Sequence, residues 1–173
     1  NFFKFRFTSF FFSIKNFYKF KKFFYSKNNI FFQKKIGKGG SIYQNFISID
    51  QIIDLCAEKK NIFFKIDIEG SEYRVLKDIL NHEKVISGLV IEFHDVDLHL
   101  DKIEKFIKDL NMKLVHIHPQ NPAFVTSDSI PSQIELTFAK NPKSIGPHAE
   151  LPHKLDQPAN PSLKEIELEF EKN

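Results

Sequence analysis

Apolar side chains follow a helical spacing directly after residue 48. Ser48 and Gln51 form a capping-box pattern, in which the serine side chain bonds forward and the glutamine side chain reaches back. The positions behind this cap are apolar at i, i+3, i+4 and i+7, and they are Ile49, Ile52, Ile53 and Cys56. We therefore predict a helix that starts after Ser48 and ends near Lys60.

Four apolar runs predict β-strands in the rest of the chain. The first is apolar at nearly every position, which is typical of a strand covered on both faces in a parallel sheet. The four predicted strands are Ile62–Ile68, Val85–Phe93, Lys113–His118 and Ile134–Ala139.

Helical patterns lie between the first three of these strands. One predicted helix follows Gly70 and has an inner face of Val75, Leu76, Ile79 and Leu80. The next is entered through an acidic turn around Asp97 and Asp101, and its inner face is Ile103, Phe106, Ile107 and Leu110. Because strands alternate with helices, we expect an α/β fold with a largely parallel sheet.

The two ends of the chain differ from this central part. Residues 1–36 are rich in Phe and Lys, and we interpret them as a low-complexity segment outside the domain. We place the domain at residues 37–145 and interpret residues 146–173 as a Pro-rich extended tail. Residues 1–35 carry nine basic residues and no acidic one. This segment fits a basic amphipathic helix in peripheral contact with a membrane, or a poorly constrained or out-of-frame translation. No folded nucleic-acid-binding motif accompanies the basic run, so we expect no nucleic-acid partner.

The composition excludes several classes of protein. With one cysteine, the chain cannot form an intramolecular disulfide framework or a multi-Cys zinc site. Its uncharged runs are far shorter than the roughly 20 residues that cross a bilayer, so we expect a cytoplasmic protein, with peripheral membrane contact left open. Because the chain begins with Asn1 and its only methionine is Met112, we expect a fragment or a processed chain.

Charged side chains follow the ends of the first two predicted strands. Asp67 and Glu69 share one side of the first strand, and Glu92 and His94 share one side of the second. Ligands of open parallel sheets bind beyond the carboxyl ends of the strands. If the two strands are neighbours, three carboxylates and one imidazole converge on one crevice.

This predicted cluster has more than one chemical interpretation. His94 could act as a general base, or Asp67, Glu69, Glu92 and His94 could bind a divalent cation such as Mg²⁺ or Mn²⁺, although nothing in the sequence specifically indicates a metal. A structural role is the alternative, because carboxylates at a helix start satisfy free N–H groups, and we favour that role for Glu72. For Asp67 we favour function, because a carboxylate that ends a buried strand needs a partner.

The run Phe64-Lys65-Ile66-Asp67-Ile68-Glu69-Gly70-Ser71-Glu72 resembles the signature of the FkbM family of S-adenosylmethionine-dependent methyltransferases. The helix start Ser48-Ile49-Asp50 and the strand end Ile91-Glu92-Phe93-His94 are also similar to parts of that family. Together with a similar C-terminal stretch, Leu155–Pro161, the likeness spans about residues 45–170.

The resemblance implies the second half of a class I methyltransferase domain, a Rossmann-like three-layer fold. Its strands would be mostly parallel, with a last antiparallel strand. It implies methyl transfer from S-adenosyl-L-methionine to a hydroxyl group of a sugar or small metabolite. By this resemblance Asp67, Ile68, Glu69 and Gly70 would face the cofactor, and Asp67, Glu69 and His94 would be the catalytic residues, with His94 as the base.

Parts of the family pattern have no counterpart in this chain. The first strand and the glycine-rich turn that hold the cofactor are missing, so we expect a fold without its N-terminal half and impaired activity of the chain alone. The Ile62–Ile68 strand would then have an uncovered edge, which favours self-association. A catalytically inactive remnant, acting as a binding or membrane-surface module, is the main alternative function, and a metal-dependent hydrolase is a third.

Overall fold

The computed structural model describes residues 15–24, 29–37, 45–56, 58–143 and 151–168. The chain divides into two compact units, Asn1–Lys34 and Lys35–Asn173. In the first unit, residues 15–24 form a helix whose Phe17 and Phe23 side chains are largely exposed. Among the described residues, no helix is both long and apolar enough to span a bilayer. Most of the segment predicted to contact a membrane, residues 1–14 in particular, lies outside the described residues.

The second unit begins with two short parallel strands, β1 (Lys35–Ile36) and β2 (Phe46–Ile47), which the sequence did not predict. Helix α2 (Ile49–Leu55) follows, and both hydrogen bonds of the predicted capping box between Ser48 and Gln51 are present. We predicted that this helix ends near Lys60, but it ends at Leu55. The apolar face of this helix ends at Cys56. Because helix propensity alone does not stabilise so short a helix, the helix does not continue beyond the face that packs.

Strand β3 (Ile62–Ile66) ends before Asp67, two residues earlier than predicted. The helix predicted after Gly70 consists of a single 3₁₀ turn, η1 (Glu72–Arg74), and a short helix, α3 (Leu76–Asn81). Its predicted inner face is confirmed, because Val75, Leu76 and Ile79 are buried and Leu80 packs against the core.

Strand β4 (Ile86–His94) leads directly into helix α4 (Val96–Asp109). The acidic turn predicted around Asp97 and Asp101 is part of this helix, which starts earlier than predicted and is kinked at His99. Strands β5 (Lys113–Pro119) and β6 (Gln133–Ala139) complete the unit close to their predicted bounds.

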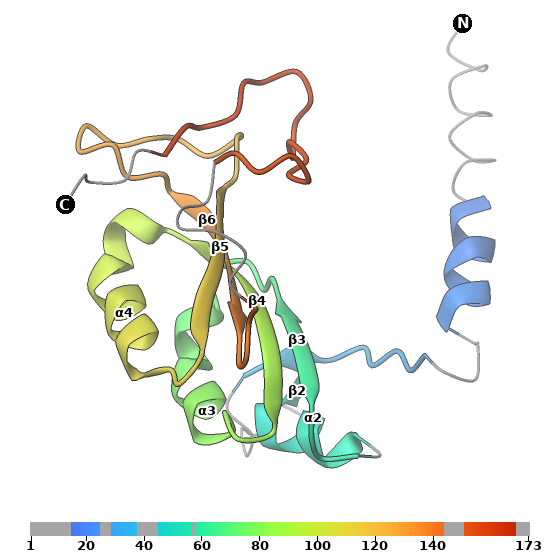
Figure 1. Cartoon of the computed structure of the whole chain (residues 1–173). Coiled ribbons are helices and arrows are strands. Elements are labelled where there is room, and N and C mark those ends of the chain that lie inside the picture. Colours follow the sequence, from blue (N-terminus) through green and yellow to red (C-terminus); the bar gives the residue numbers. More distant parts are fainter. Residues whose placement is uncertain (1–14, 25–28, 38–44, 57, 144–150, 169–173) are drawn as a thin grey trace, which may run out of the picture. The chain divides into compact units, whose positions relative to one another are not determined.

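The main sheet has four strands in the order β3-β4-β6-β5 (Figure 1). β3 and β4 are parallel, whereas β6 is antiparallel to both of its neighbours. Three strands of this sheet therefore run in one direction, and β6, the last strand among the described residues, runs in the other between β4 and β5. An α/β fold is confirmed, but only one of the three pairings in the sheet is parallel. β3 and β5 are the edge strands.

The hydrophobic core lies on one face of this sheet, where α3 and α4 pack (Figure 1). Leu89, Ile91 and Phe93 of β4 are fully buried there, and the Phe93 and Phe106 rings are 6.3 Å apart. The opposite face carries polar and partly exposed side chains, which include Lys65, Glu92 and Glu135. In the described part of residues 35–173, helices cover one face, so the sheet and its helices form two layers where three had been predicted.

A C-terminal arm, residues 151–168, has no helix or strand and lies along β5 and the loop after it. The side chain of Asn121 donates to the carbonyl oxygens of Asn160 and Leu163, at 2.8 and 3.1 Å, and accepts the Asn160 N–H at 2.9 Å. His116 Nε2 lies 2.8 Å from Asp156 Oδ1. The arm is thus attached by polar contacts to the edge of the sheet.

Candidate functional site

The turn after β3 positions the first group of candidate residues. Glu69 and Gly70 both have left-handed backbone conformations, with φ of 53° and 88°. Oε1 of Glu72 accepts the N–H groups of Ile68 and Gly70, at 3.0 and 3.3 Å. Glu72 is fully buried, so its carboxylate holds this turn from inside the protein. Glu72 therefore has the structural role that we favoured, but it holds the turn that precedes η1 and does not cap the helix itself.

The end of β4 positions the second group. His94 is its last residue and is only 8% exposed. The hydroxyl group of Tyr73 donates to the backbone carbonyl of His94 at 2.5 Å, which connects η1 to the strand end. Asp95 follows with a left-handed φ of 51°, and α4 starts after it. A non-glycine residue in this conformation is uncommon, and the turn after each of the two strands carries one, Glu69 after β3 and Asp95 after β4.

Three carboxylates surround the imidazole of His94. Nε2 lies 3.5 Å from Glu69 Oε2 and 3.6 Å from Glu92 Oε1. On the other side of the ring, Nδ1 lies 3.4 Å from Glu72 Oε1. Within the described part of the chain, neither His94 Nδ1 nor Glu72 Oε2 has a hydrogen-bond partner, although both atoms are buried. Buried polar atoms without partners are rare and require an explanation, which a functional role would provide.

The predicted convergence of the two strand ends is present in the structure. One ligand atom each from Asp67, Glu69 and His94 lies within 4.8 Å of the other two. The three residues come from neighbouring parallel strands and the turns that follow them. Glu92, the fourth residue of the predicted cluster, borders this group through its contact with the His94 ring.

Negative charge dominates the electrostatics of this edge of the sheet. Burial of the Glu92 side chain, with smaller contributions from the charges of Asp67 and Glu135, raises the pKa of Glu92 above its ordinary value. The nearby cation, Lys65, lies 2.5 Å from Glu135 Oε2. That hydrogen bond is the main reason why the pKa of Lys65 is raised. Lys65 is thus directly paired with Glu135 and not with Asp67 or Glu92.

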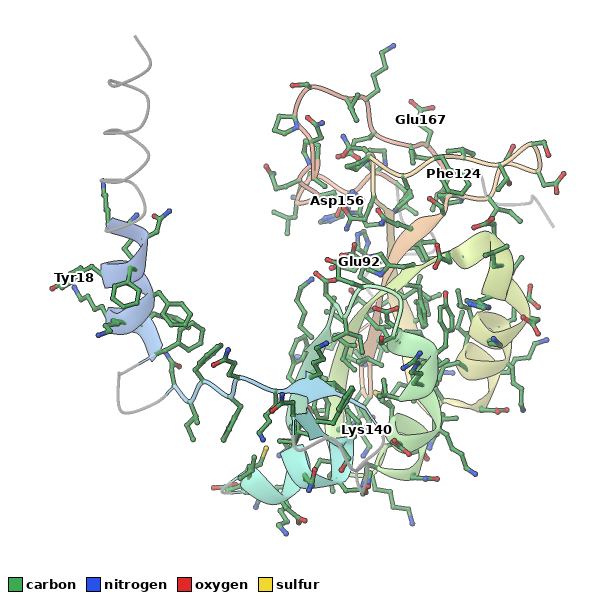
Figure 2. The ribbon with its side chains drawn as sticks, turned by 180° about the vertical axis from the view of Figure 1, so that it is seen from behind. Tyr18, Glu92, Phe124, Lys140, Asp156 and Glu167 are labelled. Atoms are coloured by element: carbon green, nitrogen blue, oxygen red, sulfur yellow. The ribbon has the colours of Figure 1, made fainter. Side chains whose placement is uncertain are left out.

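A cleft of about 350 Å³ opens at the two strand ends. Glu69, Gly70, His94 and Asp95 line one side of it, and residues 122–124 and 132–133 line the other. Glu92 lies at the end of the sheet that faces the loop carrying Phe124 (Figure 2). A side chain at Gly70 would meet Asp95 Oδ2 at 3.8 Å, an ordinary contact.

Sequence reasoning missed two contributors to the site. One is Tyr73, which looked like an ordinary helix residue. The other is the loop between β5 and β6, whose Ser132 carbonyl accepts the Val96 N–H at 3.1 Å. The length of this loop was a usable signal, because long loops without regular structure in compact domains are commonly functional.

Two histidines of β5 and the single cysteine are not part of the cluster. His116 and His118 contact Asp156 and Glu165 of the C-terminal arm. The thiol of Cys56 donates to the Ile52 carbonyl at 3.5 Å, as a packed side chain does.

Comparison of the chain with protein-family models, with curated proteins and with solved structures found no significant match. The resemblance to the FkbM methyltransferases therefore stays a prediction from the sequence, and the function has to be argued from the site.

Proposed function

We propose that the cleft at the ends of β3 and β4 belongs to an S-adenosylmethionine-dependent O-methyltransferase, with a sugar or small-metabolite hydroxyl as the acceptor. The observation that carries the proposal is the position of Asp67 and His94, side by side at the carboxyl ends of two neighbouring parallel strands. Ligand sites of α/β sheets lie at this edge. The signature run quoted above lies across the end of β3 and the turn after it.

The direction of the strands also supports the proposal. The resemblance implies parallel strands followed by a last antiparallel one. β3, β4 and β5 run in the same direction and β6 runs against them, which agrees with that expectation.

His94 has the geometry of a general base. Its Nε2 faces the carboxylates of Glu69 and Glu92 at the cleft, whereas Nδ1 faces the buried carboxylate of Glu72. A carboxylate behind an imidazole orients the ring and stabilises the imidazolium that forms when the ring accepts a proton. An acceptor hydroxyl in the cleft would give its proton to Nε2.

The residues of the cleft fit part of the methyl donor. S-adenosylmethionine supplies a methyl group on a positively charged sulfonium. Carboxylates of Asp67, Glu69 and Glu92 provide negative charge beside the cleft, which attracts such a cation. With about 350 Å³, the cleft is near the lower end of ligand-site volumes, so it suits the acceptor or one portion of the donor. Asp67, Ile68, Glu69 and Gly70 would hold that portion.

Calorimetric titration of the whole 173-residue chain with S-adenosylmethionine, and with its demethylated product, tests this function. A chelator in both solutions keeps divalent cations out of the measurement. We expect saturable heat with the native chain and weaker binding by the Asp67→Asn variant. The matched control is Glu104→Gln, an exposed carboxylate on α4, which should bind like the native chain. Absence of binding at millimolar ligand would contradict the proposed function for this chain.

A further inference from the structure

We propose that Asp67, Glu69 and His94 bind a divalent cation, for which Mn²⁺ is a better match than Mg²⁺. The cation would be held by one carboxylate oxygen of each acid and by Nε2 of the imidazole. This proposal does not depend on methyl transfer, because it rests on the ligand atoms and not on the signature run. With the cation bound, Nε2 has no lone pair left to accept a proton, so His94 would act as the general base only in the metal-free protein.

The spacing of the ligand atoms suits a single small ion. The three atoms lie within 4.8 Å of one another, and Glu69 Oε2 is 3.5 Å from His94 Nε2. Two ligands that bind one ion at about 2.1 Å lie roughly 3.0–3.4 Å apart in octahedral or tetrahedral geometry. The native arrangement is therefore within a few tenths of an ångström of a binding geometry for this pair.

The state of His94 is an independent indication of a ligand. The side chain is nine-tenths buried, and among the described residues no hydrogen bond reaches its Nδ1. Nε2 points to carboxylate oxygens at 3.5 and 3.6 Å, beyond a normal hydrogen bond. A buried imidazole usually has a partner on each ring nitrogen. Nδ1 faces Glu72, and a cation between Nε2 and the carboxylates would provide the partner on the other nitrogen.

Glu72 supplies the support that a metal-binding histidine requires. Its Oε1 is 3.4 Å from His94 Nδ1, on the side of the ring away from the cluster. Histidine ligands commonly donate their second ring N–H to a carboxylate, which fixes the tautomer that leaves the other nitrogen free for the metal. A small contraction of this contact would give such a hydrogen bond.

The charge of the surroundings also favours a cation. The carboxylate of Glu69 lines the cleft and those of Asp67 and Glu92 lie beside it, whereas the nearby Lys65 is paired with Glu135 at 2.5 Å. Glu92 is outside the group of three ligand atoms but close to the ring, so it can accept a hydrogen bond from a metal-bound water. Two carboxylates and one imidazole suit Mn²⁺, because oxygen ligands favour Mg²⁺ and Mn²⁺ and the nitrogen ligand disfavours Mg²⁺.

Titration of the whole chain with Mn²⁺ alone, followed by water-proton relaxation and by calorimetry, tests the site. We expect saturable binding of one ion. The exposed carboxylate of Glu69 can be changed to the amide without disturbing the core, because its side chain is 85% exposed. Glu69→Gln should weaken Mn²⁺ binding by at least about 10-fold to 100-fold. Changes of this size are typical even for residues that only support the metal ligands. Asp67→Asn should do the same.

Two comparisons distinguish a specific metal site from the general attraction of cations to acidic groups. Glu104→Gln, which removes an exposed carboxylate from α4, should leave the affinity unchanged. His94→Ala should reduce the preference for Mn²⁺ over Mg²⁺, and melting followed by circular dichroism shows whether this variant folds. Binding that Glu69→Gln and Asp67→Asn leave unchanged, or no saturable binding at millimolar Mn²⁺, would overturn the proposal. Since this titration contains no S-adenosylmethionine, its result is separate from the test of methyltransferase function.

Discussion

Glu72 Oε1 lies 3.4 Å from His94 Nδ1 and also accepts the backbone N–H groups of Ile68 and Gly70. One buried oxygen therefore fixes the turn after β3 and faces the imidazole at the end of β4. The two strand ends are coupled through this carboxylate, so a change at Glu72 should affect both the local structure and the orientation of His94.

Replacement of Glu72 by Leu should destabilise the fold. The leucine has similar volume but leaves two backbone N–H groups without their acceptor, and a buried donor without a partner costs about 1–3 kcal/mol. Glu72→Gln keeps an amide oxygen that can accept both groups, so it should be less destabilising. Urea unfolding followed by far-ultraviolet circular dichroism measures the difference. A leucine variant as stable as the native chain would contradict the role of Glu72 in the turn.

Gly70→Ala should destabilise the protein through the backbone. Gly70 has φ of 88°, and an L-residue in a left-handed conformation costs roughly 1–2 kcal/mol. The added methyl group would meet Asp95 Oδ2 at 3.8 Å, an ordinary contact, so we expect no additional steric penalty. Glu69→Gly is the matched comparison, because it removes a side chain from a left-handed position and should cost less. Equal costs for the two variants would count against this explanation.

The stability contributed by Glu92 should depend on pH. Burial and the nearby Asp67 charge raise its pKa in the folded protein, so folding favours the protonated form. This contribution is fully present below the ordinary carboxyl pKa and is lost as pH rises through the raised value. Glu92→Gln remains neutral, and its melting temperature relative to the native chain should therefore be higher near pH 7 than near pH 4. The same difference at both pH values would be inconsistent with a raised pKa.

Asn121→Ala should release the C-terminal arm. The amide makes three hydrogen bonds to the backbone of Asn160 and Leu163, and the residue is only 6% exposed. Trypsin should then cut faster after Lys154 and Lys164, which lie on the arm. Asn121→Asp keeps the acceptor and loses the donors, so we expect an intermediate rate. Unchanged cleavage in the alanine variant would show that other contacts hold the arm.

Local patterns predicted the strands of the main sheet, the helices between them and the residues of the central cluster, but not the short strands β1 and β2. The capping box at Ser48 marked the start of α2, and alternation along the chain predicted that β3 and β4 are parallel. The side shared by Glu92 and His94 follows from the two-residue period of β4. We assigned Asp67 and Glu69 to one side of the strand by the same period. Because β3 ends at Ile66, it is the turn after the strand that positions these two residues.

Features set by tertiary contacts could not be predicted in this way. The insertion of β6 between β4 and β5 leaves no trace in hydrophobic periodicity, which identifies a strand but not its neighbours. The bond from Tyr73 to the His94 carbonyl depends on how η1 packs across the strand end. Helix α2 ended early because the packing surface, and not the helix propensity of the residues after Cys56, set its length.

The place of β6 in the sheet also bears on how the protein is made. β5 pairs only with β6 in this sheet, and β4 has β6 on one side. The ribosome synthesises β6, residues 133–139, after both of its partners. The edges of β4 and β5 that pair with β6 therefore leave the exit tunnel unpaired within the described sheet. The growing chain must therefore keep β4 and β5 from aggregating until β6 emerges, so the interval between the synthesis of β5 and that of β6 is when these edges are most exposed.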